Sequence, residues 1–468
     1  MPDLSRSAVL PRGSRAVILG MARQGTALAR YLAGQGIQVT VSDSRTAERL
    51  QAELAELAGL DIEYALGGHP LGLLDGCDVL YVSGGVPLDI PIVQEAAKRG
   101  VRLSNDAREF LLRCPAPVVG ITGSAGKTTT TALVGHMLQA SGVRTWVGGN
   151  IGNPLISDLP AVQATDRVVM ELSSFQLELM DISPRIAGVL NITPNHLDRH
   201  HTMEAYIAAK RNIVAHQRSG DLAVLAYDEP NARGLAQATR ADVRYFSVEE
   251  EVPEGAFLRG RALILRRDGV DTTIVTREAV RLRGLHNVLN VLAAIALADA
   301  AGATPEGMRR AIEAFAGVPH RLEEVRRLRG VLWVNDSIAT APERVAAALD
   351  AFDEPLILLA GGRDKDLPWE HFAERAVRRV RVLVLFGEAA PLIEAQVQAA
   401  LDGRDYTAPL VMEETVAVET LEQAVAIAAE RARDGEVVLL SPGGTSFDAF
   451  KDFEARGARY RQLVERLR

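Results

Sequence analysis

The stretch VVGITGSAGKTTTT at residues 118–131 constrains this chain more than any other part of it. β-Branched residues run into a glycine-rich turn, and a helix-forming stretch follows at 132–140. A strand, loop and helix in this order bind phosphate, because glycines let backbone N–H groups approach the oxygens and the helix N-terminus favours negative charge. Lys127 supplies a positive charge, and Thr128 or Thr129 can coordinate Mg²⁺. The stretch therefore predicts a nucleotide-binding loop in an α/β domain.

The glycine spacing of this loop differs from the common P-loop pattern. GxxxxGK[ST] requires glycine at the position of Ile121, whereas the glycines here stand at 120, 123 and 126. We interpret the loop as a P-loop variant. A glycine-rich turn without a ligand is the alternative, and the GKTTTT run after a β-branched strand argues against it.

Length, charge and cysteine content limit the class of protein. The 468 residues predict three domains at about 150 residues each. The net charge of −8 argues against a nucleic-acid partner. Cys77 and Cys114 are the only cysteines, which excludes a disulfide framework or a CxxC metal site and fits a reducing cytosol. The start of the chain lacks the apolar core of a signal peptide, and no apolar run reaches the ~18 residues of a membrane span, so we expect a cytoplasmic protein.

The first part of the chain has a Rossmann-like pattern. Residues 15–20 and 37–43 are expected to be strands around a helix at 26–33, with the turn GMARQG between the first strand and the helix. Ala22 replaces the second glycine of the dinucleotide-binding motif. We expect a nucleotide at this turn, with Asp43 able to hold a ribose hydroxyl; a purely structural βαβ unit is the alternative.

Three polar residues of the central part follow expected strands or lie in an expected helix. Glu171 ends an apolar run within VVMELSSFQLE at 168–178, and His196 also follows a strand. Open α/β sheets bind ligands at the carboxyl ends of their strands, so Glu171 is a candidate Mg²⁺ ligand there. Lys210 lies in a helix expected at 203–216. By themselves, Glu171 could be a surface glutamate and Lys210 a solvated helix lysine.

The last part of the chain repeats the alternation of strands and helices. Strands are expected at 331–336, 381–387 and 436–446, and the stretch 355–366 is expected to be a strand followed by a glycine-rich turn. The predicted fold class is α/β with a Rossmann-like N-terminal domain, a central P-loop mononucleotide-binding domain and a C-terminal Rossmann-like domain. The predicted boundaries are 1–113, 114–317 and 318–468.

Ten stretches, taken in order, show that the chain resembles the Mur ligases over essentially its whole length. They are GITGSAGKTTT (120–130), GGNIGNP (148–154), ELSSFQLE (171–178), NITPNHLDRH (191–200), AAK (208–210), GLHNVLN (284–290), PHR (319–321), NDS (335–337), GGRDKD (361–366) and SPGGTSFDAFKDFEARG (441–457). Within the family, ELSSFQLE and the tail SFDAFKDFEARG indicate the glutamate-adding branch.

The resemblance implies an ADP-forming amide ligase of peptidoglycan precursor synthesis. The carboxylate of UDP-N-acetylmuramoyl-L-alanine attacks the γ-phosphate of ATP to give an acyl phosphate. The amine of D-glutamate then displaces phosphate through a tetrahedral intermediate. Because an anionic carboxylate must approach an anionic triphosphate, cations have to screen both groups and hold them in line. We expect the chain to act as a monomer on these small molecules.

The resemblance also implies roles for residues around ATP and two Mg²⁺ ions. Lys127, Glu171, His196 and Lys210 are the expected catalytic residues. The implied ATP site comprises Gly123, Ser124, Ala125, Gly126, Lys127, Thr128, Thr129, Asn287, Asn290, Arg321 and Asp336, with His320 beside it. Thr128 or Thr129 with Glu171 would hold one Mg²⁺ ion, and His196 would hold the second. Lys210 matches the family lysine that CO₂ converts to a carbamate, which would turn a cation into an anionic oxygen ligand.

Two further sites are implied for the other substrates. The UDP-linked substrate would contact Arg23, Gln24, Ser44, Arg45, Asn150 and His196. Glutamate would contact Thr340, Lys365, Ser446, Phe447 and Phe453, and Lys365 is the expected partner of a glutamate carboxylate. The GMARQG turn would thus serve uridine diphosphate rather than a dinucleotide.

One position departs from the family pattern, and other readings stay open. Ile338 stands where the family has a lysine, in NDSIAT, so a sister ligase that adds L-glutamate is an alternative. Another Mur step or a folylpolyglutamate-type synthase fits the C-terminal tail less well. A non-catalytic nucleotide-binding relative would not need Lys127, Glu171, His196 and Lys210 together. A motor ATPase would need a strand-end aspartate, where this chain has Glu171.

Overall fold

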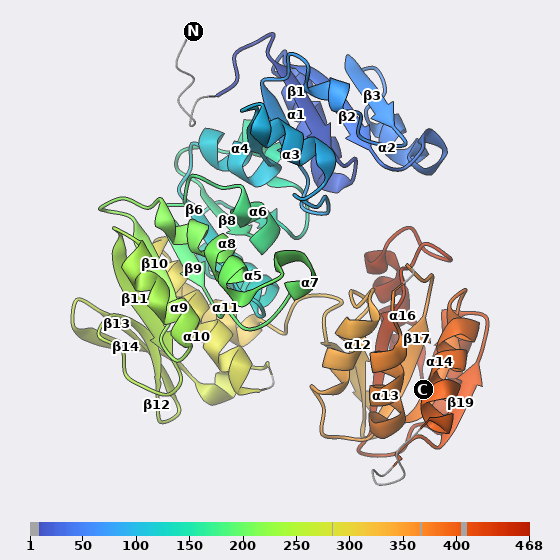
Figure 1. Cartoon of the computed structure of the whole chain (residues 1–468). Coiled ribbons are helices and arrows are strands. Elements are labelled where there is room, and N and C mark those ends of the chain that lie inside the picture. The colour runs from blue at the N-terminus through green and yellow to red at the C-terminus, as the bar shows by residue number, and fades with distance from the viewer. Residues whose placement is uncertain (1–8, 283, 366, 404–409) are drawn as a thin grey trace. The chain divides into compact units, whose positions relative to one another are not determined.

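The computed structural model describes residues 9–282, 284–365, 367–403 and 410–468 (Figure 1). The chain divides into two compact units, Met1–Phe315 and Ala316–Arg468. Asp366, which belongs to the motif GGRDKD, lies outside the described residues. The first unit contains two β-sheets and the second unit contains one. This is the predicted α/β class, with three sheets in succession along the chain.

The first sheet has five parallel strands in the order β3-β2-β1-β4-β5. The loops after its strands therefore emerge at one edge, which positions the GMARQG turn beside the loops after β2, β3 and β4. Val17, Leu19, Leu80 and Val82 pack against α3 on one face. The elements are β1 (Arg15–Leu19), α1 (Arg23–Gly34), β2 (Gln38–Asp43), α2 (Gln51–Glu56), β3 (Ile62–Leu66), β4 (Val79–Val82), α3 (Pro91–Lys98), β5 (Arg102–Ser104) and α4 (Asp106–Arg113).

The second sheet has nine strands in the order β14-β13-β12-β11-β10-β9-β6-β8-β7. Its strands are β6 (Val118–Thr122), β7 (Thr145–Gly149), β8 (Arg167–Glu171), β9 (Ile186–Val189), β10 (Leu222–Ala226), β11 (Asp242–Ser247), β12 (Gly255–Arg259), β13 (Ala262–Arg267) and β14 (Val270–Thr276). Its helices are α5 (Lys127–Ala140), α6 (Ser174–Glu178), α7 (Leu197–His200), α8 (Met203–Ala215), α9 (Pro230–Gly234), α10 (Leu285–Ala300) and α11 (Pro305–Ala314). β12, β13 and β14 pair antiparallel and form consecutive hairpins at one end of this sheet.

The order of this second sheet explains where its polar residues meet. β6 lies between β8 and β9, so the phosphate loop after β6 is flanked by the ends of both neighbours. Glu171 ends β8, and Asn191 and His196 follow β9. The apolar helix α10 lies against the sheet and α5, and Gly188 leaves room for the Leu297 side chain.

The second unit is a six-stranded sheet in the order β15-β16-β20-β17-β18-β19, in which only β15 runs antiparallel to its neighbour among the described strands. Alternate residues of each strand face opposite sides, as the pleat requires. The elements are β15 (Glu323–Leu328), β16 (Val331–Asn335), α12 (Pro342–Leu349), β17 (Leu356–Gly361), α13 (Glu370–Arg379), β18 (Val380–Phe386), α14 (Ala390–Asp402), β19 (Glu414–Ala417), α15 (Leu421–Arg431), β20 (Val437–Gly443) and α16 (Phe453–Arg466).

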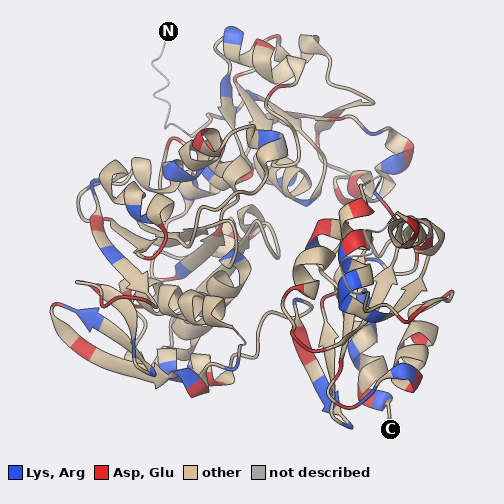
Figure 2. Cartoon of the chain, turned by 60° about the horizontal axis from the view of Figure 1, so that its bottom comes forward, with Lys and Arg blue, Asp and Glu red and all other residues tan. Residues whose placement is uncertain are grey.

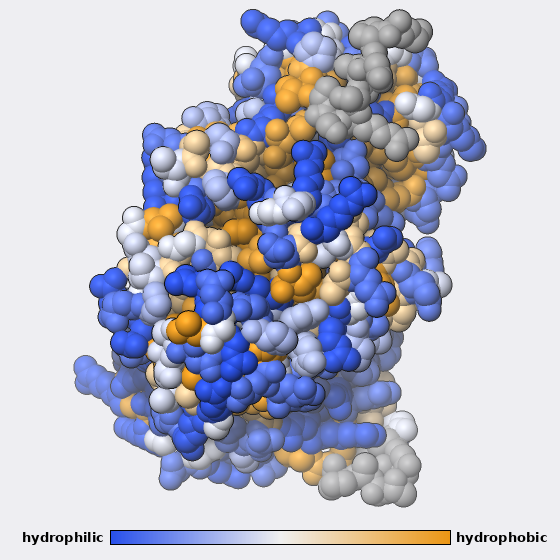
Figure 3. Space-filling view, turned by 90° about the vertical axis from the view of Figure 1, so that its left-hand side faces the viewer, coloured by the Kyte–Doolittle hydropathy of each residue, from blue (hydrophilic) through white to orange (hydrophobic). Residues whose placement is uncertain are grey.

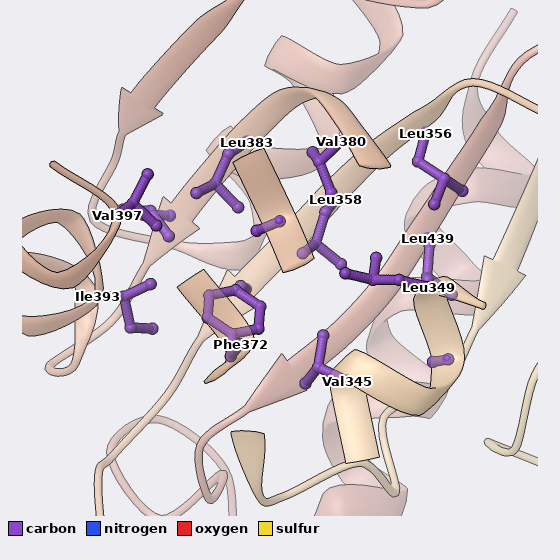
Figure 4. Packing of buried hydrophobic residues seen from close by; sticks show 14 of the residues in the cluster. Val345, Leu349, Leu356, Leu358, Phe372, Val380, Leu383, Ile393, Val397 and Leu439 are labelled. Carbon is purple, nitrogen blue, oxygen red and sulfur yellow. The ribbon is translucent and has the colours of Figure 1, made fainter. Parts of the chain in front are cut away.

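Two hydrophobic layers sandwich this sheet. Leu356 and Leu358 point to the layer formed with α12, α13 and α14, where Phe372 and Ile393 lie (Figure 4). Ile357, one residue along, joins the opposite layer with α15 and α16. Burying a leucine or isoleucine side chain contributes about 1.5–3 kcal/mol, so the two layers fix the strand register and hold the strand ends in place.

Helix α4 connects the first two sheets through polar contacts. Asn105, its N-cap, donates from Nδ2 to the carbonyl of Gln176 in α6 over 2.7 Å. The buried guanidinium of Arg108 donates to both carboxylate oxygens of Asp181, over 2.7 and 3.1 Å. A bidentate charged pair of this kind fixes orientation as well as distance. The first two sheets are thereby joined at the helix that follows Glu171.

Charged residues of both signs are interspersed over all parts of the chain (Figure 2). On the face shown in Figure 3, hydrophobic residues lie in small groups between hydrophilic ones. No helix among the described residues is long and apolar enough to cross a membrane.

Candidate active site

The phosphate loop joins β6 to α5 and has room only for glycine at residue 126. Gly126 has φ +83°, a left-handed conformation that disfavours other residues. A Cβ atom there would lie 2.2 Å from the Asn290 side-chain oxygen. Asn290 in turn donates to the side-chain oxygen of Asn287 over 3.1 Å. The structure therefore brings the predicted residues Asn287 and Asn290 to the phosphate loop.

Residues from the loop after β9 hold the phosphate loop in shape. The backbone N–H of Ala125 donates to Asn191 Oδ1 over 2.8 Å, and Asn191 Nδ2 donates back to the Ala125 carbonyl over 3.2 Å. Ser124 Oγ lies 2.9 Å from the carbonyl oxygen of Thr193 and 3.0 Å from the hydroxyl of Tyr206. The sequence motifs contain Asn191 but assigned no role to it or to Tyr206. For Asn191 a sequence signal was present, because polar residues that follow a strand next to β6 lie beside the loop.

Two lysines converge on the same backbone oxygen at the start of this loop. Lys127 Nζ donates to the Gly123 carbonyl over 2.7 Å, and Lys210 Nζ donates to the same carbonyl over 3.0 Å. Lys210 is only 1% exposed and also donates to Thr122 Oγ1. Burial lowers the pKa of Lys210 well below the usual value for lysine, the charge of Lys127 lowers it further, and Glu171 opposes the shift.

Glu171 organises the opposite side of the loop. Thr128 Oγ1 donates to one of its carboxylate oxygens over 2.9 Å, and Asn150 Nδ2 donates to the other over 3.1 Å. The sequence left Thr128 and Thr129 as equal candidates, whereas the structure brings Thr128 to Glu171. Within the described residues, no group of three or more His, Cys, Asp or Glu side chains is placed to hold a metal ion.

The loop carrying His196 contains strained backbone and an aromatic stack. His196 has φ +54° and caps the short helix α7. Its ring lies 5.1 Å from that of Phe175, which also stacks on His200 at 5.2 Å and 6°. The Arg199 guanidinium lies over the same phenyl ring at 4.6 Å, and Arg199 also donates to the Val86 carbonyl over 3.2 Å. Phe175 therefore anchors the loop that positions His196.

A cavity of about 270 Å³ lies between the first two sheets of the first unit. It is lined by Ala22, Arg23, Gln24, Ser83, Gly84, Gly85, Gly149, Asn150, Gly152 and Pro154. Arg23 donates to the Gly152 carbonyl, and Gln24 Nε2 donates to the Gly149 carbonyl over 3.4 Å. Arg23 and Gln24 of the GMARQG turn and Asn150, predicted from two separate places in the sequence for one substrate, thus line one cavity.

The charged side chains at and after the end of β2 form hydrogen bonds and ion pairs with other groups of the protein. Asp43 accepts from the Met21 backbone N–H over 2.7 Å and from Arg45 at both oxygens. Burial would raise the pKa of Asp43, but the hydrogen bonds from Arg45 and Met21 lower the pKa to about 2. Arg45 also pairs with Glu53 at 3.4 Å, and Ser44 is exposed. The expectation that Asp43 holds a ribose stays a prediction, because here its carboxylate positions the GMARQG turn.

In the second unit, Asp336 is buried at the end of β16. Its carboxylate accepts from Ser441 Oγ over 2.8 Å and from the Leu322 backbone N–H over 3.2 Å. Burial raises its pKa to about 7, against the opposing hydrogen bond of Ser441. His320 lies 3.0 Å from the side-chain nitrogen of Asn335, and Arg321 is exposed.

Two of the residues predicted to bind the substrate glutamate lie near a buried arginine of the second unit. Arg456, 1% exposed, donates to the carbonyl oxygens of Ser337, Gly444 and Thr445. Burial lowers its pKa to about 10. Ser446 follows Thr445 directly and is buried, and Phe453 accepts from Ser337 Oγ at its carbonyl over 2.8 Å. The sequence motifs contain Arg456 but assigned it no role.

The remaining predicted members of this group lie on neighbouring loops. Lys365 Nζ lies 3.5 Å from Thr340 Oγ1. Burial lowers the pKa of Lys365, and the nearby charges of Arg344 and Arg456 lower it further. Phe447 is 62% exposed, so its ring makes no core contact of the kind that buried aromatics make. The arrangement concentrates positive charge at the carboxyl ends of β16, β17 and β20.

Three family models match successive parts of the chain. They are the MurD-like N-terminal domain of Mur ligases, over residues 14–105, the Mur ligase middle domain, over 121–298, and the Mur ligase glutamate ligase domain, over 320–444. The chain belongs to the Mur ligase family.

Curated relatives of this Mur ligase match it over nearly its full length. A protein of Symbiobacterium thermophilum named UDP-N-acetylmuramoylalanine--D-glutamate ligase is 43% identical over 97% of this chain and 98% of its own. A protein of the same name from Acetivibrio thermocellus is 38% identical over 97% of each chain. The branch indicated by ELSSFQLE is thus also the branch of these relatives.

Solved structures are similar to this Mur ligase in fold. The UDP-N-acetylmuramate-alanine ligase of Thermotoga maritima has a TM-score of 0.57 at 20% identity, over 96% of this chain and 99% of its own. A pseudomurein peptide ligase type C from Methanothermus fervidus has a TM-score of 0.53 at 18% identity, over 97% and 100%. At these identities the likeness supports the fold alone.

Proposed function

We propose that this Mur ligase joins D-glutamate to the carboxylate of UDP-N-acetylmuramoyl-L-alanine, with ATP converted to ADP and phosphate. The observation that carries the proposal is the convergence of Lys127 and Lys210 on the Gly123 carbonyl, beside the hydrogen-bonded pair of Thr128 and Glu171. Cations and an anion arranged around a phosphate loop suit transfer of a phosphoryl group to a carboxylate. The names of the nearly full-length relatives support the choice of substrates.

The phosphate loop would bind ATP through its backbone N–H groups and Lys127. When phosphate oxygens arrive, they offer Lys127 Nζ a charged acceptor in place of the neutral Gly123 carbonyl. Asn290 and Asn287 flank the same loop and present polar atoms to the nucleotide. Arg321 and Asp336 of the second unit remain proposed ATP contacts.

The donor set around Glu171 fits a hard divalent cation. The Thr128 hydroxyl and the Glu171 carboxylate are oxygen donors 2.9 Å apart, which is the chemistry that Mg²⁺ prefers. His196 and a carbamate on Lys210 would hold a second ion. When bound, these ions would reduce the repulsion between the triphosphate and the substrate carboxylate. The Glu171 carboxylate lies at the end of β8, and the Thr128 hydroxyl lies in the first turn of α5, directly after the phosphate loop.

Carbamylation of Lys210 is supported by its burial beside another cation. A lowered pKa leaves more of the amine neutral, and the neutral amine is the form that attacks CO₂. A bond forms between Nζ and the carbon of CO₂, and a proton leaves the nitrogen. The product is an anion, which would remove the repulsion between Lys210 and Lys127.

The buried guanidinium of Arg456 supports anion binding in the second unit. Its described hydrogen-bond partners are neutral: the carbonyl oxygens named above and Ser337 Oγ. Together with Lys365, Arg456 would favour the carboxylates of the incoming glutamate. We further propose that the chain acts as a monomer in the cytoplasm, since each proposed site residue comes from this one chain.

The test is ADP release and product formation by the purified protein. We expect release only when UDP-N-acetylmuramoyl-L-alanine, ATP, Mg²⁺ and D-glutamate are all present, and a product whose mass equals the sum of the two acids less one water. L-Glutamate is the matched control. Preferential use of L-glutamate would overturn the stereochemical assignment, and absence of any amide product would overturn the ligase function.

A further inference from the structure

An arginine to which the sequence motifs gave no role joins two parts of the candidate site. Arg199, in the short helix α7, donates from Nη2 to the carbonyl oxygen of Val86 over 3.2 Å. Val86 belongs to the loop after β4, and residues 83–85 of that loop line the cavity between the first two sheets. The contact therefore connects the wall of the cavity to the loop after β9, which carries His196.

The segment that Arg199 contacts has a fixed place in the cavity wall. The backbone N–H of Val86 donates to the Ser83 carbonyl over 2.9 Å, which closes residues 83–86 into a turn. Ser83 Oγ in turn donates to the carbonyl oxygen of Gly20 over 3.2 Å. Gly20 is the first residue of the GMARQG turn. The Val86 carbonyl is thus held by the same contacts that shape the cavity.

Arg199 is also connected to His196, through the main chain and through an aromatic ring. The backbone N–H of Arg199 donates to the His196 carbonyl over 3.1 Å. The Arg199 guanidinium lies over the ring of Phe175 at 4.6 Å, and the His196 ring lies 5.1 Å from the same ring, tilted by 59°. A guanidinium is attracted to the negative face of an aromatic ring. A displacement of Arg199 would therefore be felt at His196.

A separate set of contacts holds α7 against α6. His200 is buried, and its Nε2 lies 2.9 Å from Ser174 Oγ. Its ring also stacks on Phe175 at 5.2 Å. Ser174 and Phe175 belong to α6, which follows Glu171 closely in the chain. These contacts fix the loop relative to Glu171, whereas Arg199 fixes it relative to the cavity. Loss of the Arg199 side chain should leave α7 folded but able to shift away from the cavity wall.

We propose that Arg199 is a positioning residue, which sets the place of His196 relative to the cavity for the UDP-linked substrate. This inference rests on the proposed function, since it takes that substrate and the role of His196 as given. Reacting groups must come within about 3–3.5 Å of one another, and a displacement of about 1 Å can lower the rate about a hundredfold. Arg199 controls this distance because it is bonded to the cavity wall at one end and packed beside His196 at the other.

The first test measures the kinetic constants of two variants of the full chain. Arg199→Met keeps much of the side-chain length but removes the donor and the charge, whereas Arg199→Lys keeps both. We expect Arg199→Met to lower kcat about tenfold or more, with KM for ATP and for D-glutamate within about twofold of the unaltered protein, and Arg199→Lys to recover part of the loss. Arg185→Met is the matched control, since Arg185 is exposed and pairs with Asp221 at 3.7 Å. An unchanged kcat in Arg199→Met would overturn this inference and leave the proposed function intact.

The second test observes His196 without any reaction. In protein with isotope-labelled histidine rings, the magnetic resonance signal of His196, assigned with His196→Gln, depends on the distance of its ring from Phe175. At fixed pH we expect Arg199→Met to shift this signal and to leave the signal of His371, an exposed residue of α13, unchanged. A signal of His196 that stays in place in Arg199→Met would overturn the inference even if the rate falls, because the arginine would then act by another route.

Discussion

Lys127 and Lys210 donate to one acceptor, the Gly123 carbonyl oxygen, over 2.7 and 3.0 Å. Lys210 is buried there, and the charge of Lys127 disfavours a second charge beside it. Two ammonium groups on a single neutral oxygen are stable together only if one gives up its charge or an anion joins them. This relationship distinguishes Lys210 from an ordinary helix lysine and leads to the first prediction.

Lys210→Ala is expected to abolish ligation while the protein keeps a near-native fold. The substitution removes a buried amine whose charge the fold already disfavours, so the loss concerns the site rather than the core. Short-chain acid anions such as formate should partly restore activity by supplying the oxygen ligand. ADP release and circular dichroism measure the two effects, with exposed Lys98→Ala as control. Full activity of Lys210→Ala would show that no carbamate is needed.

Gly126→Ala is expected to weaken ATP binding at least tenfold. The new methyl group would meet the Asn290 side-chain oxygen at 2.2 Å and would also strain a backbone at φ +83°. Gly142→Ala is a matched control, because Gly142 has φ +82° with no heavy atom within 4 Å of the added carbon. Titration with a fluorescent ATP analogue compares the two. If both variants bind ATP equally well, the collision with Asn290 has no effect on the loop.

Asp106 is expected to contribute a loss of stability as pH rises from about 4 to about 6. Burial raises the pKa of this carboxyl group from 3.8 to about 6, so the folded state holds a proton that the unfolded state has released. The stabilisation is complete below pH 4 and is lost as pH passes 6. Asp106→Asn should flatten this part of the profile, as measured by urea unfolding at several pH values. An unchanged profile in Asp106→Asn would contradict the assignment.

Arg108→Ala is expected to destabilise the first unit by about 3 kcal/mol, because it leaves the junction of α4 and α6 without its bidentate pair and removes a buried side chain. Arg99→Ala serves as control, since Arg99 forms ion pairs with Asp75 and Glu95 at the surface. Surface pairs of that kind contribute little, and the control should leave the urea midpoint unchanged. Equal midpoints for the two variants would show that the α4 junction adds no stability.

The parts of the site that follow strand ends could be predicted from the sequence. Glu171, His196 and the phosphate loop all come after apolar runs, and parallel strands bring such residues to one edge. The fold class and the family followed from similar local patterns. The pairing of Thr128 rather than Thr129 with Glu171 did not, because it depends on the direction of side chains in the first turn of α5.

Contacts that depend on tertiary packing could not be predicted from the sequence. Neither β3 nor β5 was predicted, since both are short and only partly buried. Tyr206 in α8 reaches Ser124 across the site, and Arg456 is buried although arginines are mostly exposed. His196 has a left-handed backbone and a tilted ring contact with Phe175, and no pattern of spacing records such strain. The domain boundary expected at 113 stays a prediction, and so do the expected roles of Phe447, Phe453 and Arg321.

The contacts between α4 and α6 have a consequence for exchanging parts among related ligases. Asn105 and Arg108 belong to the segment that ends the first sheet, while their partners Gln176 and Asp181 follow Glu171 in the second. A chimaera joined at residue 113 would match each donor with an acceptor from a different parent. Recombination should therefore carry 105–108 and 176–181 together, or place the junction at 315, where one compact unit ends and the next begins.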